Sequence, residues 1–237
     1  MFRKTAILTG ILFLICTGST LLSFPFAGAL LEDSRFLETL AGKGTSIIMG
    51  TLLEFIWAIS CAGIAISLYT VLRKYDHFLA LGAVALRVIE AIFVLAGTLC
   101  LLSLLTVSRD FIVAGPEETI PLQTLASVLS SVRYWSHNYM ASLAFAAGAL
   151  LYYIVLFRSR LIPRWLSGWG GIAALLSLAA TILSINTGDF DFSSINTILN
   201  IPIGLNELVL AIWLIFKGFN PGTAIPVKSH YTGQEQP

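Results

Sequence analysis

Six apolar stretches, each long enough to cross a lipid bilayer as a helix, constrain this chain more than any other feature. They cover residues 5–28, 46–72, 78–106, 122–157, 165–186 and 197–217. A spanning helix needs about 20 mostly apolar residues. Backbone polar groups in lipid have to be paired within the protein, so an open chain crosses the bilayer as helices. We therefore predict an all-α, polytopic membrane helix bundle with six transmembrane helices.

The composition is typical of a chain that uses lipid as its solvent. Hydrophobic residues make up 57% of the sequence and charged residues 11%, while soluble domains carry about 25% charged residues. The formal net charge of +1 provides no basic field for nucleic acid, so membrane lipids are the expected partners. We expect one transmembrane domain over residues 1–219 and a flexible cytoplasmic tail over residues 220–237.

Lys and Arg are unevenly distributed between the two sides of the predicted spans. Nine of the 14 lie on the side of both termini, three lie on the other side and two lie within spans. Cytoplasmic loops of membrane proteins are rich in Lys and Arg, so we predict cytoplasmic termini and a multi-pass protein of the inner (cytoplasmic) membrane. The first stretch also resembles a secretory signal, but its apolar run is longer than usual, so we expect it to remain as a span.

Segments at the outer side give further expectations. A short amphipathic helix is expected around residues 36–40. Residues 108–121 are predicted to form a loop, because Pro116 and Pro121 act as helix breakers. The stretch 122–157 is too long for one straight crossing, so we expect an interfacial turn or a protruding end near its start.

Charged residues inside the spans are the first candidates for a functional site, because charge in hydrocarbon is costly and rare. At 1.5 Å per residue, Arg87 and Glu207 lie about 14 Å from the cytoplasmic ends of their helices, and Glu90 lies about 18 Å from it. Arg87 and Glu90 are three residues apart and share a helix face. We expect the Arg87 guanidinium to be held between the two carboxylates, since it can bind a carboxylate with two parallel hydrogen bonds.

A second polar group is predicted nearer the outer surface. Glu54 lies at about 27 Å and His137 at about 30 Å on the same scale. Arg133 and His137 are four residues apart and share a face, and Asn138 follows His137 directly. These four residues are expected to line a polar recess that opens outward.

Two interpretations stay open for each group. Arg87, Glu90 and Glu207 form either a structural clamp that fixes helix register or a site with a titrating carboxyl group, as a proton-coupled carrier needs. His137 is either an interfacial histidine wetted by headgroups or a functional partner of an acidic residue. In both groups the choice depends on whether water or a ligand reaches the charges.

Metal-binding and catalytic motifs are absent from the sequence. Carboxylate-bridged metal bundles use Glu-x-x-His pairs, and none occurs here, so no metal and no other cofactor is expected. Gly-x-Ser-x-Gly, His-Glu-x-x-His and phosphate-loop motifs are also missing, which argues against an enzyme. Cys16, Cys61 and Cys100 lie in apolar stretches and are interpreted as small packing residues.

Four stretches carry a resemblance to a known family. They read RKTAILTGILFLI, LYTVLRKYDHFLALGAVALRVIEA, LYYIVLFRSRLIPRWLSGWGGIA and LNELVLAIWLIFKGFNP. Together they resemble the bacterial multi-pass membrane family described as domain of unknown function 4386, from residue 3 to residue 221. The resemblance implies a six-helix protein of the bacterial inner membrane. It implies no activity and no catalytic residues.

Three function classes follow from these observations. The favoured one is a protein that binds or transports a small molecule or ion in an outward-facing polar pocket, with the Arg87, Glu90 and Glu207 network at its floor. The second is an intramembrane lipid-modifying enzyme that uses Glu54 or Glu90 with His137. The third is a non-catalytic scaffold or regulatory subunit. A cavity reaching Glu90 would favour the first, a lateral groove ending at Glu54 and His137 the second, and a solid bundle the third.

Overall fold

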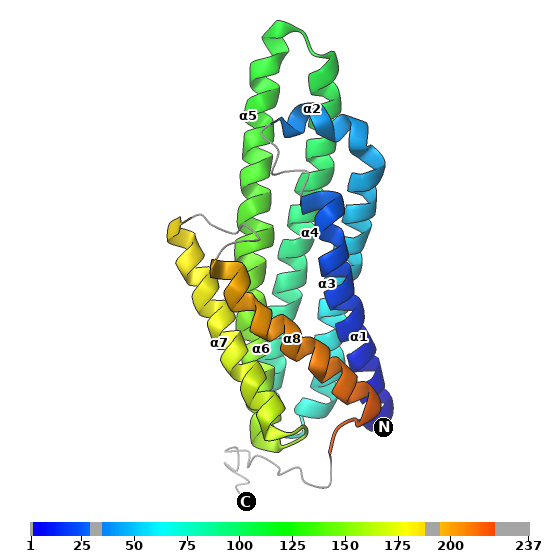
Figure 1. The fold of residues 1–237 in the computed structure, drawn as a ribbon, viewed down its shortest axis with the longest axis vertical. Helices are drawn as coiled ribbons and strands as arrows, with labels where there is room; N and C mark the ends of the chain where they lie inside the picture. Colours follow the sequence, from blue (N-terminus) through cyan, green and yellow to red (C-terminus); the bar gives the residue numbers. More distant parts are fainter. Residues whose placement is uncertain (1, 29–34, 188–194, 221–237) are drawn as a thin grey trace, which may run out of the picture.

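The computed structural model describes residues 2–28, 35–187 and 195–220 of the chain, and every regular element within them is helical (Figure 1). The predicted tail beyond residue 220 lies outside the described residues. The helices are α1 (Phe2–Ser23), α2 (Phe36–Leu40), α3 (Gly44–Leu72), α4 (His77–Val113), α5 (Pro116–Arg133), α6 (Ala141–Ser159), α7 (Arg164–Thr187) and α8 (Ile195–Phe216). Within the described residues, six helical runs are long and apolar enough to span a membrane, which confirms the predicted fold class.

The six spanning runs form a closed ring. Each packs against the next in the order α1, α3, α4, α6, α7 and α8, and α8 packs back against α1. Neighbours in this order are also neighbours along the chain, because short connections fold consecutive spans against each other. The packing of α1 against α8 closes the ring by joining its first and last members. Gly10 allows this close approach, since a Cβ there would lie 2.7 Å from the Ala211 carbonyl oxygen.

The predicted loop over residues 108–121 is wrong. Helix α4 continues to Val113 and α5 begins at Pro116, so a two-residue connection makes a helical hairpin that extends beyond the other spans (Figure 1). Pro116 does not break the helix because it occupies the first turn, where its missing N–H would have had no partner. The expected protruding end is therefore present, and residues 116–159 run on as one helix without an interfacial turn.

The short helix expected around residues 36–40 is α2, which packs against the base of the hairpin. Its Leu37 belongs to a cluster with Leu104, Val107 and Ala126. The Ser108 hydroxyl donates to the Leu37 carbonyl oxygen at 2.5 Å and accepts from the Ala41 N–H at 2.9 Å. These contacts anchor α2 and Ala41, which follows it, to α4.

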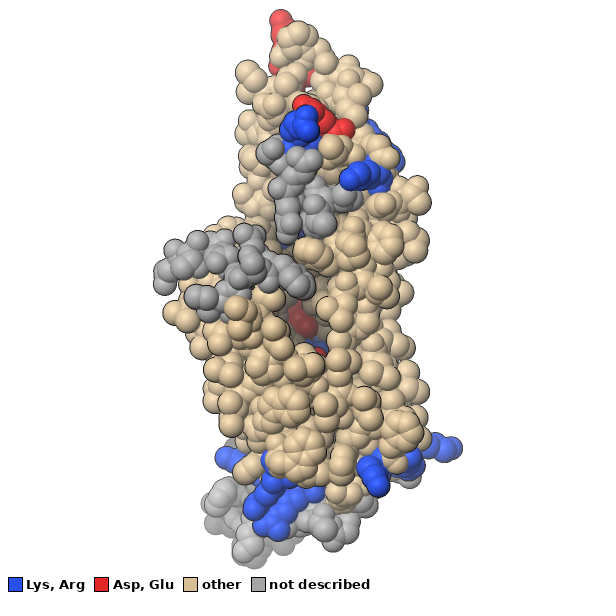
Figure 2. All heavy atoms as spheres, in the orientation of Figure 1, with Lys and Arg blue, Asp and Glu red and all other residues tan. Residues whose placement is uncertain are grey.

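Charged side chains gather toward the two ends of the long axis. Basic side chains lie at the end where α1 begins, a broad band of largely uncharged surface follows, and the upper part carries both basic and acidic side chains, with acidic ones at the tip of the hairpin (Figure 2). The height of the uncharged band suits a bundle embedded in lipid, because charged groups are excluded from hydrocarbon. The assignment of the basic end to the cytoplasm stays a prediction.

Candidate functional site

The seven predicted site residues lie in two clusters inside the bundle. The outer cluster contains Glu54 of α3, Arg133 at the end of α5, and His137 and Asn138 just after it. The inner cluster contains Arg87 and Glu90 of α4 and Glu207 of α8. All of them except His137 and Asn138 are buried.

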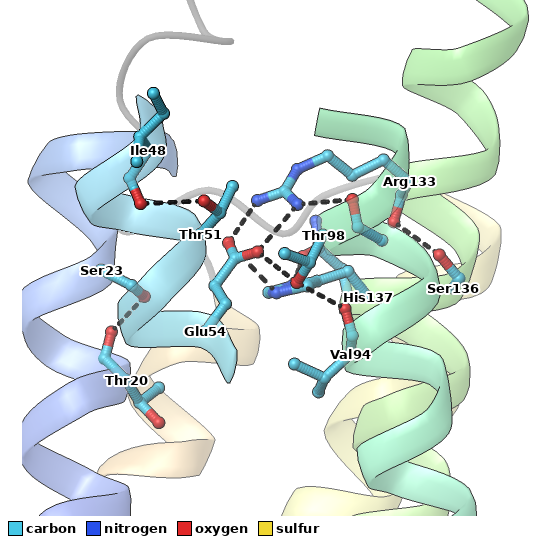
Figure 3. A network of polar contacts seen from close by, with 12 residues as sticks. Thr20, Ser23, Ile48, Thr51, Glu54, Val94, Thr98, Arg133, Ser136 and His137 are labelled. Carbon is cyan, nitrogen blue, oxygen red and sulfur yellow. Dashed lines mark hydrogen bonds and ion pairs between the residues drawn. The ribbon is translucent and has the colours of Figure 1, made fainter. Parts of the chain in front are cut away.

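In the outer cluster, Arg133 holds the Glu54 carboxylate with both arms of its guanidinium (Figure 3). Arg133 Nη2 donates to Oε1 at 2.6 Å and Nη1 donates to Oε2 at 3.2 Å. Nη1 also donates to the Gly97 carbonyl oxygen at 2.8 Å. The Thr98 hydroxyl adds a further donor to Glu54 Oε2 at 2.7 Å. Glu54 is therefore a fully hydrogen-bonded carboxylate that joins α3, α4 and α5.

His137 and Asn138 complete the edge of this cluster. His137 Nε2 lies 3.4 Å from Glu54 Oε1, and its Nδ1 lies 3.4 Å from Asn138 Oδ1. The Trp57 ring packs edge-on against the imidazole at a centroid distance of 5.1 Å. Gly97 makes room for the imidazole, since a Cβ there would lie 2.7 Å from His137 Cβ. The histidine is thus fixed beside the acidic residue rather than free at the interface.

A π-helix at Tyr134–Met140 sets the directions of these side chains. Its hydrogen bonds run from residue i to i+5, which widens the turn, and such segments are frequent at functional sites. The widened turn follows directly after Arg133 and contains His137, and both side chains reach Glu54. The sequence has no glycine or proline here, so the residues gave no local signal for this irregular turn.

In the inner cluster, Arg87 forms an ion pair with Glu90, with Nη1 lying 2.9 Å from Oε2. The guanidinium stacks over the Phe145 ring of α6 at 5.0 Å. Gly148 accommodates the arginine stem, because a Cβ there would lie 3.3 Å from Arg87 Cγ. The predicted buried salt bridge is confirmed. Contacts with Phe145 and Gly148 restrict the orientation of the guanidinium.

The rest of the guanidinium has no partner among the described residues. Arg87 is 1% exposed, yet Nε and Nη2 make neither a hydrogen bond nor an ion pair with any of them. Leaving a buried donor unsatisfied costs about 1–3 kcal/mol, and more for a charged group. Arg87 is therefore a buried cation with two donors unused.

Glu207 does not close the arrangement expected from the sequence. Within the described residues, Glu90 is the only carboxylate within 4.0 Å of the Arg87 nitrogens. Glu207 lies close enough to Arg87 for their charges to interact, but its Oε1 instead accepts the Tyr152 hydroxyl at 3.2 Å. The neighbouring α6 side chain, rather than the arginine, is its direct partner.

Two tyrosines and an asparagine of this cluster were missed by the sequence reasoning. Tyr152 and Tyr153 are both 1% exposed, and the Tyr153 hydroxyl donates to Asn206 Oδ1 at 2.5 Å. Asn206 Nδ2 in turn donates to the Leu166 carbonyl oxygen of α7 at 3.1 Å. The signal available was the pair of adjacent tyrosines within an apolar stretch, since buried tyrosine hydroxyls need a partner.

The cysteines of α1 and α3 also belong to the inner cluster. Cys61 Sγ donates to Glu90 Oε1 at 3.2 Å and lies 3.5 Å from Cys16 Sγ. Both thiols are free and buried. Their interpretation as packing residues is thus incomplete, because Cys61 supplies one of the polar partners of Glu90. Among the described residues, no three His, Cys, Asp or Glu side chains gather as a metal site would require.

Two depressions lie in the surface of the bundle. Figure 2 shows a hollow in the face that carries α8, with acidic and basic atoms visible at its floor amid uncharged surface. A separate groove of about 440 Å³ lies against α5 and the π-helix and is lined by Phe93, Ser127, Val128, Ser131, Val132, Trp135, Ser136 and Met140. No titratable carboxylate or imidazole lines that groove.

Comparison with known proteins gives the chain a family. A family model described as Domain of unknown function (DUF4386) matches residues 8–218. The chain belongs to this family. The DUF4386 match includes all residues of both clusters. No curated protein and no solved structure matches the chain.

Proposed function

We propose that this DUF4386 protein binds or transports a small molecule or ion in the polar centre of its helix ring. The observation that carries the proposal is Arg87, which is 1% exposed and leaves Nε and Nη2 without a partner among the described residues. A buried cation with unused donors suits a site that a ligand or water completes.

The contrast between the two clusters supports this assignment. Both carboxylate oxygens of Glu54 accept hydrogen bonds from Arg133 or Thr98, so the Glu54–Arg133 pair has the bonding of a structural clamp. Beside this pair, His137 Nε2 makes no hydrogen bond with a described residue. Arg87 has one ion-pair partner for three guanidinium nitrogens. Hydrogen-bond completeness therefore favours a structural role for the outer cluster and ligand binding for the inner one.

Access supports the same assignment. The hollow of Figure 2 exposes charged atoms at its floor, as a pocket that reaches the charged centre would. The lateral groove along α5 is lined by apolar and serine side chains and lacks Glu54 and His137, so it gives no support to a lipid-modifying enzyme. The third function class is a scaffold whose charged centre is closed to water. The test below distinguishes it from a binding protein.

The basic end of the molecule sets the orientation that we propose. Lys and Arg residues gather at the end where α1 begins and α8 finishes (Figures 1 and 2), and cytoplasmic ends of membrane proteins carry this excess. The α4–α5 hairpin and the outer cluster then face the other side. This orientation fits a multi-pass protein of the cytoplasmic membrane.

The test uses the two thiols of the inner cluster as reporters of water access. In a Cys100→Ser chain reconstituted in lipid, Cys16 and Cys61 are the remaining thiols. A small, charged methanethiosulfonate reagent reaches them only through water. We expect one of them to react in the folded protein, with Cys16→Ser and Cys61→Ser chains assigning the product by mass. Complete protection in the folded chain, with full reaction after denaturation, would contradict the proposal and favour a dry scaffold.

A further inference from the structure

We propose that the Nε and Nη2 edge of Arg87 is a receptor for an oxyanion, namely the carboxylate or phosphate group of a ligand. This inference rests on the proposed function and specifies the chemistry of its ligand. It goes beyond the Arg87–Glu90 ion pair, because it concerns the two donors which that pair leaves unused.

The geometry of the guanidinium supports a two-point contact. Glu90 occupies Nη1, and Nε–H and Nη2–H lie along one edge of the planar group. Two donors on one edge match the two oxygens of a carboxylate or phosphate and form parallel hydrogen bonds with it. The unused part of Arg87 therefore has the shape of an oxyanion receptor.

The receptor is held in position before a ligand arrives. The Phe145 ring lies under the guanidinium at 5.0 Å, and the arginine stem packs against the backbone at Gly148. Glu90 is itself fixed by the Cys61 thiol at 3.2 Å. Such preorganisation lowers the entropy cost of binding, so a ligand would not have to order this side chain.

The other carboxylates of the two clusters are engaged elsewhere. Glu54 is held by Arg133 in the outer cluster, and Glu207 accepts from Tyr152. Among the described residues, Glu90 is the only carboxylate that pairs with Arg87. In this proposal the oxyanion of a ligand is the acceptor for the two remaining donors.

The surroundings indicate the rest of the ligand. Phe145 lies against the guanidinium, and Tyr152, which contacts Glu207, packs against Phe13. We therefore expect an apolar body behind the anionic head. A free fatty-acid-like solute and an anionic lipid headgroup share this chemistry. The experiment separates these two sources.

Binding is measured on the purified full chain with probes that share one octyl tail and differ in the head. Octanoate and octyl phosphate carry an oxyanion, octanol is neutral and octylammonium is a cation. We expect octanoate or octyl phosphate to stabilise the protein to heat in a saturable manner, with an affinity about tenfold or more above that of octanol. Equal effects of octanoate and octanol, or a preference for octylammonium, would overturn the proposal.

Arg87→Lys tests the two-point contact directly, because lysine keeps the charge and lacks the planar pair of donors. We expect octanoate affinity to fall about tenfold or more, and unchanged affinity would refute the two-point contact. If this variant does not fold, the comparison of heads on the unaltered chain still decides the matter. If octanol bound as tightly as octanoate, the oxyanion receptor would be refuted and the proposed pocket would remain. If Cys16 and Cys61 were protected from the charged thiol reagent in the folded chain, the pocket itself would be refuted.

Native mass spectrometry distinguishes the two sources of the oxyanion. The protein is taken from vesicles of phosphatidylcholine alone or with phosphatidylglycerol. If phosphatidylglycerol stays bound to the protein and octanoate displaces it, the natural ligand is a lipid headgroup. If octanoate binds and no lipid is retained, the natural ligand is a free solute. Absence of both kinds of binding would overturn the inference.

Discussion

Glu54 and Arg133 lie 79 positions apart in the sequence, and their side chains meet through hydrogen bonds of 2.6 and 3.2 Å. The contact joins α3 to the last residue of α5, immediately before the π-helix. Both side chains are buried, at 1% and 7% exposure. A buried charge pair is costly to break from one side only, because the remaining charge has no partner.

Glu54→Gln is expected to lower the free energy of unfolding by about 3–5 kcal/mol, because it leaves the Arg133 charge uncompensated. The double variant Glu54→Gln, Arg133→Met should be less destabilised than the single one, since it removes both charges. Chemical unfolding in detergent measures the free energy of unfolding of the unaltered chain, the single variant and the double variant. Glu38→Gln, at an exposed position, is the control and should change stability by about 0.5 kcal/mol or less. A Glu54→Gln chain as stable as this control would refute the clamp.

Gly170→Ala tests the fit of Tyr153 between α6 and α7. A Cβ at residue 170 would lie 2.2 Å from Tyr153 Cε1, so the ring has to move and its bond to Asn206 is lost. We expect a loss of about 1–3 kcal/mol from overpacking. Gly171→Ala is the matched control, since its Cβ would meet nothing closer than 3.9 Å, and it should leave the thermal midpoint unchanged or raised. Similar midpoints for both variants would contradict this packing.

Cys16 and Cys61 are expected to form a disulfide on treatment with diamide. The two sulfur atoms lie 3.5 Å apart, and a small approach of α1 and α3 brings them to the bond length of about 2 Å. Each thiol gives up a proton and an electron, and diamide is reduced to the hydrazine. Mass spectrometry of the peptides detects the link. Cys100→Ser should behave like the unaltered chain, and failure of the intact chain to link would argue against this contact.

Reporter fusions test the proposed orientation. Green fluorescent protein attached after the last residue should fluoresce in a bacterial expression host, because it folds in the cytoplasm. Alkaline phosphatase inserted between Ala114 and Gly115, at the tip of the hairpin, should be active because that tip faces the oxidising side. The reverse pair of activities would contradict the proposed orientation and place the hairpin on the cytoplasmic side.

The spans could be predicted from the sequence because bilayer thickness fixes the length of an apolar helix. The hairpin could not, since Pro116 is read as a breaker unless its place in the first turn is known. Depth along the helices predicted two groups, and the structure places Arg87 and Glu90 in a different cluster from Glu54 and His137. Depth does not give rotation about the helix axis, so it did not reveal that Glu207 turns to Tyr152 instead of Arg87.

The partners within the clusters were harder to predict for the same reason. Cys61 and Tyr153 occupy positions where an apolar residue would also fit the pattern, so periodicity treats them as packing residues. The π-helix after Arg133 changes the direction of each following side chain, and no residue type in that segment announces it. Rotation and local irregularity, rather than span or depth, limit what the sequence reveals of this site.

The contact between α1 and α8 has a consequence for how the protein is made. Helix α8 is synthesised after the other helices of the ring, so these helices enter the bilayer with a gap where it will later fit. During that interval, one flank of the Arg87 region has no covering helix, and a chain truncated before residue 195 keeps this defect permanently. Quality-control proteases would recognise such an open ring as incompletely folded, so insertion of α8 is the step that closes the ring.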